Sequence, residues 1–90
     1  PLTIRDSSII NRLDLLIYLS EKKIGTRLLF GGNLLRQPYF DRVTYRVFGS
    51  LEGTEKIAHD TFWLGLFHGI SPEQIDYVCE TLKDYVSQKI

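Results

Sequence analysis

The chain has 90 residues, and 43% of them are apolar, which is enough for one small domain with its own core. A domain of this size buries only about 60 to 65% of the surface that its unfolded chain exposes. The formal net charge is zero, which gives no support to nucleic-acid binding, and no segment is apolar enough to span a membrane.

The first third of the chain predicts a strand, a helix and a second strand. Residues 2–5 alternate apolar and polar side chains, as a short edge strand does. Asp6, Ser7 and Ser8 are suitable N-caps for a helix that runs to about residue 23, and Gly25 is placed to end it. The main apolar stripe of this helix consists of Ile9, Leu13, Leu16, Ile17 and Ser20. Three residues outside the stripe are expected to contact another domain: Leu15, Tyr18 and Leu19.

The middle of the chain is less regular. Residues 26–30 predict a strand with two apolar faces, followed by a turn at Gly31, Gly32 and Asn33 and one helical turn before Pro38. Residues 39–51 predict extended loop. Thr54 can cap a short helix over residues 55–59.

The last third predicts a strand over residues 61–67 and a long final helix. Ser71, Pro72 and Gln74 together form a helix start with a capping box. The apolar stripe of the final helix consists of Ile75, Val78, Cys79, Leu82 and Val86. We therefore interpret Cys79, the only cysteine, as a buried structural thiol, and a lone thiol favours a reducing, cytoplasmic compartment.

Together these elements predict an α/β (α+β) fold of two layers, with about three strands and two long helices on one face. The two later strands are apolar on both faces, and the helices can cover only one of them. A second covering element, or a large exposed apolar patch, is therefore expected.

The loop after the second strand carries the most unusual chemistry. It reads Thr-Arg-Leu-Leu-Phe-Gly-Gly-Asn-Leu-Leu-Arg-Gln-Pro over residues 26–38. Glycines let a ligand approach the backbone closely, and arginine side chains match phosphate and carboxylate geometry. The candidate ligand-binding residues are Arg27, Gly31, Gly32, Asn33, Arg36 and Gln37. An ordinary strand-turn-helix corner, with both arginines in local ion pairs, is the alternative.

Other polar residues give weaker signals. His59, His68 and Cys79 form no recognisable metal set, and no motif for catalysis or for binding a phosphate or a dinucleotide occurs. Asp60 is expected to be a structural hydrogen-bonding residue at the strand start. Trp63 and its neighbour Phe62 are expected in the core or at a domain interface.

The string over residues 26–38, with Asp-Thr-Phe-Trp-Leu-Gly at 60–65 and Gly69, resembles the C-terminal part of CDP-4-keto-6-deoxyglucose 3-dehydratases. These enzymes of lipopolysaccharide and deoxysugar biosynthesis are similar in fold to the pyridoxal-phosphate-dependent nucleotide-sugar aminotransferases. The resemblance extends from about residue 2 to residue 86. It implies that residues 1–90 form the C-terminal small domain of a larger fold-type I pyridoxal-phosphate enzyme. Pro1 at the start and the absence of Met agree with a chain cut from a longer protein.

The resemblance also implies cofactors and partners for the larger protein. Pyridoxal or pyridoxamine phosphate, and an iron–sulfur cluster, would bind to the upstream domain, and none is expected in these residues. The expected partners are the upstream domain, a nucleotide-sugar substrate, a second copy of the whole protein and a separate flavin and iron–sulfur reductase, with neither nucleic acid nor membrane.

For the fragment itself, the implied role is to close one wall of the substrate site. Arg27 and Arg36 would pair with diphosphate or carboxylate while Asn33 orients the sugar. The fragment would carry no catalytic residue and would be inactive alone. Two alternatives stay open, a C-terminal domain of a true nucleotide-sugar aminotransferase and a small α/β module that binds a partner.

Overall fold

The computed structural model describes all 90 residues and contains three strands, three α-helices and two short 3-10 helices. In chain order the elements are β1 (Leu2–Thr3), α1 (Arg12–Glu21), β2 (Thr26–Leu28), η1 (Leu34–Arg36), η2 (Pro38–Arg42), α2 (Glu52–Asp60), β3 (Thr61–Leu64) and α3 (Pro72–Lys89). The predicted order of strands and helices is confirmed. Strands β2 and β3 are shorter than the sequence predicts. The chain leaves the sheet after Leu28 and after Leu64, whereas the predicted strands run to residues 30 and 67.

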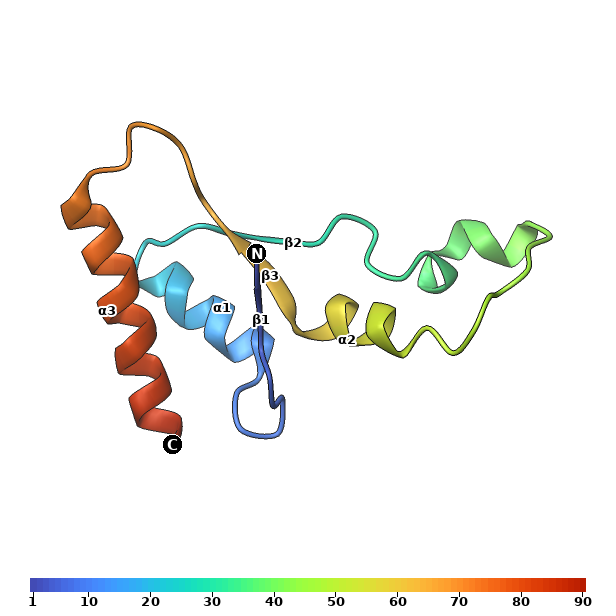
Figure 1. The fold of residues 1–90 in the computed structure, drawn as a ribbon, viewed down its shortest axis with the longest axis horizontal. Coiled ribbons are helices and arrows are strands. Elements are labelled where there is room, and N and C mark those ends of the chain that lie inside the picture. The colour runs from blue at the N-terminus through green and yellow to red at the C-terminus, as the bar shows by residue number, and fades with distance from the viewer.

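The three strands form an antiparallel sheet with β3 at its centre, in the order β1-β3-β2. Phe62 of β3 lies opposite Leu2 of β1 and Leu28 of β2. The hydroxyls of Thr3 and Thr61 form a hydrogen bond of 2.8 Å between adjacent strands. The register therefore brings the N-terminus of the chain beside a segment about sixty residues away (Figure 1).

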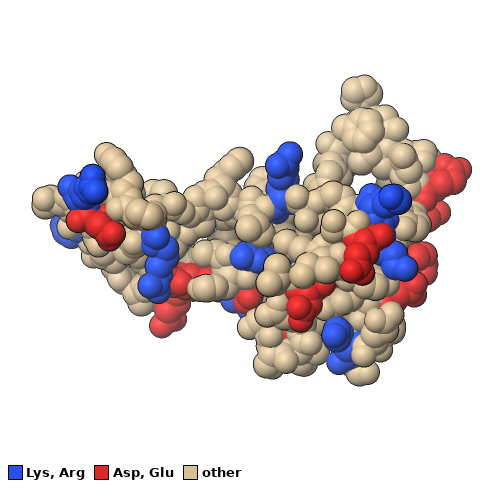
Figure 2. All heavy atoms as spheres, turned by 180° about the vertical axis from the view of Figure 1, so that it is seen from behind, with Lys and Arg blue, Asp and Glu red and all other residues tan.

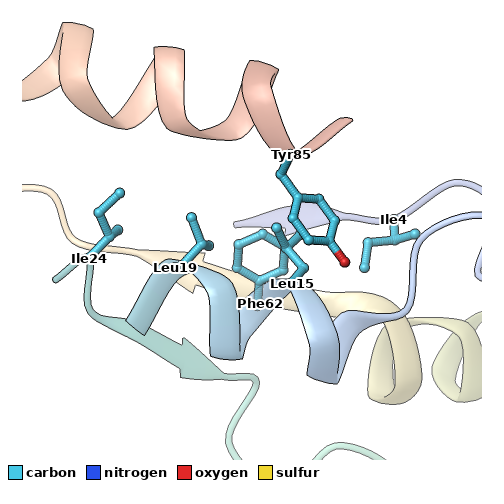
Figure 3. Close-up of a cluster of buried hydrophobic side chains, with 6 residues drawn as sticks. All are labelled: Ile4, Leu15, Leu19, Ile24, Phe62 and Tyr85. Carbon is cyan, nitrogen blue, oxygen red and sulfur yellow. The ribbon is translucent and has the colours of Figure 1, made fainter. Parts of the chain in front are cut away.

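The core lies between one face of this sheet and the helices α1 and α3. Figure 3 shows the Phe62 ring of the central strand among side chains of both helices. The buried apolar residues are Ile4, Leu15, Leu19, Ile24, Phe62 and Tyr85. The predicted two-layer arrangement, with two helices on one face of the sheet, is confirmed.

Helix α1 uses a different face from the one that the sequence predicts. Leu15 and Leu19 are buried, whereas Leu13 is 66% exposed and Ile17 is 49% exposed. The expected stripe that contains Leu13 and Ile17 is therefore wrong, and Leu15 and Leu19, expected to contact another domain, belong to the core. The buried face of α1 also carries Arg12, whose Nη1 donates to the backbone oxygens of Ala58 (2.6 Å) and Thr61 (3.0 Å).

The ends of α1 also differ from prediction. Asp6 accepts hydrogen bonds from the backbone and hydroxyl of Ser8 in a separate turn, so it does not cap the helix. The cap is Asn11, whose Oδ1 accepts from the backbone nitrogen of Asp14 at 3.2 Å. At the other end Lys23, with φ of 63°, takes the left-handed conformation that the sequence assigns to Gly25.

The capping box at the start of α3 is confirmed. The hydroxyl of Ser71 accepts from the backbone nitrogen of Gln74 at 3.2 Å, and the Gln74 side chain accepts from the Ser71 nitrogen at 2.9 Å. Helix α2, in contrast, lacks the predicted Thr54 cap and begins after Leu51, which has φ of 57°.

The buried face of α3 is rotated from the predicted stripe. Thr81 and Tyr85 are buried, whereas Ile75 and Cys79 are exposed, so the interpretation of Cys79 as a buried thiol is wrong. Burial of Thr81 costs little free energy, because its hydroxyl donates to the Tyr77 carbonyl at 2.7 Å. The hydroxyl of Tyr85 is buried without a hydrogen-bond partner.

Residues 30–51 form an arm that extends away from the core (Figure 1). The radius of gyration is 16.0 Å, whereas a compact domain of this length would have about 12 Å. The arm contains η1 and η2 and an aromatic cluster in which Phe40 lies edge-on to Tyr39 and Tyr45. None of the helices is both long and apolar enough to cross a membrane.

Candidate functional site

The double glycine turns the chain into the arm and brings it against helix α2. Gly32 has φ of +63°, and a Cβ placed there would lie 3.4 Å from the Cβ of Ala58. Gly31 is less demanding, since its nearest neighbour would be the flexible Leu34 side chain at 3.2 Å. The positive φ of Gly32 is therefore what favours glycine there, since a Cβ would make only an ordinary contact with α2.

Asn33 is 5% exposed and both ends of its amide are used within the chain. Its Oδ1 accepts from the backbone nitrogen of Leu35 at 3.0 Å and caps η1. Its Nδ2 donates to Oε1 of Glu55 at 2.5 Å. These bonds fix the start of the arm to helix α2.

Glu55 holds the loop and the helix together. Its Oε1 also accepts from Nε of Arg36 at 3.0 Å, and its Oε2 lies 3.3 Å from Nε2 of His59. Hydrogen bonds from Arg36, and then from Asn33, hold the pKa of Glu55 below its ordinary value. Glu55 was not among the predicted site residues, because it lies 22 residues from Asn33 in the sequence. The spacing of Glu55 and His59, one helical turn apart, was the signal available in the sequence.

Gln37 completes the internal bonding of the loop. Its Nε2 donates to the carbonyl oxygen of Gly31 at 2.8 Å. Side chains of the loop therefore bond to the loop's own backbone. Among its predicted polar residues, Arg36 keeps the most free capacity, because only Nε is bonded and the side chain is 75% exposed.

A cavity of about 310 Å³ lies between the arm and the start of α2. We call it the arm cavity. It is lined by Asn33, Leu35, Arg36, Val47, Ser50, Leu51 and Glu55. One cation and one carboxylate, paired with each other, therefore stand beside apolar side chains and one hydroxyl.

Arg27 lies elsewhere. It is on β2 opposite Trp63, and its side chain makes neither a hydrogen bond nor an ion pair. It lines a second, larger groove of about 1050 Å³, to which Arg36 and Asn33 do not contribute. The structure therefore brings Gly31, Gly32, Asn33, Arg36 and Gln37 together and leaves Arg27 apart.

The larger groove is the exposed apolar surface that the sequence predicts. We call it the sheet groove. Phe30 and Trp63 lie with ring centroids 6.1 Å apart on it, and Cys79 of α3 is at its wall. Phe30 is 93% exposed and Leu66 is 92% exposed. In Figure 2, charged side chains are scattered and leave broad uncharged areas between them.

The structural role expected for Asp60 agrees with its surroundings. It is buried at the junction of α2 and β3, and its carboxylate pairs with Lys56 at 2.5 Å. Its carbonyl oxygen accepts from the nitrogen of Ile4 at 2.9 Å. Phe62 is in the core, as expected, and Trp63 faces the sheet groove.

A lysine that binds pyridoxal phosphate must be free and must face a pocket. Lys56 is engaged, because it donates to Asp60 and to the carbonyl of Arg5, and neither cavity contains it. Lys23 and Arg27 both line the sheet groove. No group of three or more His, Cys, Asp or Glu is arranged to hold a metal ion.

The fold defines a small α+β domain with a bonded glycine loop, a charged pair at the arm cavity and a separate apolar groove on the sheet. The family comparison is more specific. Residues 1–83 match the model of the DegT/DnrJ/EryC1/StrS aminotransferase family, and the chain belongs to this family.

Two relatives cover nearly the whole chain. It is 48% identical over 85 residues to the lipopolysaccharide biosynthesis protein RfbH of Salmonella typhimurium, covering 94% of this chain and 20% of that protein. It is 39% identical over 87 residues to a dTDP-4-dehydro-2,6-dideoxy-D-glucose 3-dehydratase of Saccharopolyspora spinosa, covering 97% and 19%. The chain thus spans about a fifth of the length of these relatives.

Proposed function

We propose that the chain is the C-terminal domain of a nucleotide-sugar 3-dehydratase that acts in deoxysugar and lipopolysaccharide biosynthesis. The observation that carries this proposal is the match along nearly the whole chain to two proteins whose names state lipopolysaccharide biosynthesis and 3-dehydratase. The resemblance of the loop over residues 26–38 to 3-dehydratases supports the same reading.

In this proposal the reaction centre lies outside these 90 residues. Pyridoxal or pyridoxamine phosphate would bind to an upstream domain of the longer protein. An iron–sulfur cluster, a separate reductase, a homodimer and a cytoplasmic location are further parts of the proposal.

The chain's own role is to form one wall of the substrate site. Its loop is held by Asn33, Gln37 and Glu55, so it can present Arg36 in a fixed place. A wall that positions substrate lowers the entropic part of the barrier without transferring a proton itself. Arg27 and Arg36 line different cavities, so they would contact different parts of the substrate or of the neighbouring domain.

The sheet groove supports the presence of an upstream domain. A small domain with large apolar side chains such as Phe30 and Leu66 exposed is typical of one face of a domain interface. We propose that the cofactor-binding domain covers this groove and that the domain alone gives no turnover with cofactor and substrate.

A domain exchange tests this function. The matching fifth of the Salmonella relative is replaced with this chain. With the flavin and iron–sulfur reductase and its electron donor present, the hybrid is assayed for formation of a 3-deoxy product from a CDP-linked 4-keto-6-deoxy sugar. We expect dehydration above background. A hybrid that folds and binds cofactor but transfers an amino group to the sugar would instead support the aminotransferase alternative, which the family's name keeps open.

A further inference from the structure

The charge of the arm cavity decides which part of a nucleotide sugar it can hold. Arg36 is its one cation, and the Glu55 carboxylate is 3.0 Å from Nε of Arg36. Near neutral pH the pair has no net charge. A diphosphate brought against Arg36 would also approach Glu55, and like charges at such distances repel.

A hydroxylated ring meets no such penalty. We propose that the arm cavity is a subsite for the neutral sugar ring of the substrate, and that Glu55 accepts a hydrogen bond from one of its hydroxyls. This inference rests on the proposed function and specifies which part of the substrate this domain contacts.

The hydrogen-bonding capacity of the cavity suits such a ligand. Oε1 of Glu55 already accepts from Asn33 and Arg36, whereas Oε2 accepts no hydrogen bond within the chain and lies 3.3 Å from Nε2 of His59. A carboxylate has about four acceptor positions, so the Oε2 side keeps capacity for a hydroxyl donor. The terminal nitrogens of Arg36 are free to donate, and Ser50 makes no side-chain hydrogen bond.

The remaining walls suit the apolar parts of a deoxysugar. Leu35, Val47 and Leu51 line the cavity beside the charged pair. A ring with hydroxyls on one side and a methyl group on another could place each against a matching surface. The volume of about 310 Å³ is at the lower end for ligand sites, which fits one ring but not a whole nucleotide sugar.

The first experiment follows backbone amide shifts by NMR while the chain is titrated with 6-deoxy-D-glucose, and separately with inorganic pyrophosphate. We expect the sugar to bind in the millimolar range and to shift amides around Leu35, Arg36, Ser50 and Leu51. We expect pyrophosphate to leave these amides unchanged. Stronger shifts of the same amides with pyrophosphate, or no shifts with the sugar, would overturn the proposal.

Single substitutions test whether Glu55 accepts a hydrogen bond from the sugar. Glu55→Gln should weaken sugar binding about tenfold, the effect of losing one hydrogen bond to a charged group. Glu52→Gln, on the same helix and exposed, is the matched control and should not change affinity. Ser50→Ala leaves the Glu55 hydrogen bonds intact, so it tests the cavity without disturbing the arm, and it should also weaken binding. Affinity equal to that of the original chain in both Glu55→Gln and Ser50→Ala would contradict the subsite. The domain exchange is independent, because dehydration by the hybrid without sugar binding here would leave the proposed function standing.

Discussion

Leucine-to-alanine changes at two positions of α1 test which face of this helix packs on the sheet. Leu19 is 0% exposed and lies in the core, whereas Leu13 on the same helix is 66% exposed. The same substitution at both positions changes helix propensity equally, so the difference between them reports packing alone.

The expected magnitudes are well separated. A leucine with no exposed surface costs about 3 kcal/mol when cut to alanine, through lost burial and the cavity left behind. The whole domain should have about 5 to 13 kcal/mol of stability, so Leu19→Ala removes a large part of it. Leu13→Ala should stay within about 0.5 kcal/mol of the original chain.

Urea unfolding followed by circular dichroism measures both variants. With an m-value of about 1.5 kcal/mol/M, Leu19→Ala should lower the midpoint by about 2 M, and Leu13→Ala by less than about 0.4 M. A larger loss for Leu13→Ala than for Leu19→Ala would refute the observed orientation of α1. It would favour the stripe that hydropathy alone predicts.

Two further predictions concern ionisable side chains. Tyr85→Phe removes a buried hydroxyl without a partner, and should raise the free energy of unfolding by about 1 kcal/mol. Burial, and then the charge of Asp14, raise the pKa of Tyr85, so its contribution to stability is present below pH 10 and is lost as pH rises through that raised pKa. The Phe variant should lack this alkaline loss, and an equal loss in both chains would contradict the assignment. For Glu55 the pKa is lowered, so its contribution is present above its ordinary value of 4.5 and is lost as pH falls through the lowered pKa. Arg36→Gln should return the pKa of Glu55 toward 4.5, measured by NMR of the carboxyl carbon, and an unchanged pKa would show that the ion pair is absent in solution.

The parts of the fold that were predictable have short-range causes. The capping box at Ser71 and Gln74 is formed by residues three apart, and its identity is set by side-chain chemistry alone. The glycine turn at Gly32 is similar, because a left-handed backbone strongly favours glycine. Asp60 was predictable as a structural residue from its place directly before a strand.

The parts that failed depend on contacts distant in sequence. Helix α1 has apolar residues on two faces, so periodicity cannot choose between Leu13 and Leu19. The choice agrees with the position of Arg12, whose bonds reach carbonyls 46 and 49 residues away. Cys79 was misplaced for a different, local reason, because Thr81 can be buried once its hydroxyl donates to the Tyr77 carbonyl within the helix.

In the candidate site, too, the residue types were predictable from the sequence and the long-range contacts were not, and this difference bears on function. The sequence identified the loop residues Asn33 and Arg36 by their chemistry, but it could not show that both bind to Glu55. That one carboxylate changes what the loop can do. Asn33 is bonded within the chain at both ends of its amide, and Arg36 is half of a neutral pair instead of a free cation. In the proposed subsite this chemistry suits a sugar ring, and the diphosphate would then pair with cations of the longer protein or with Arg27.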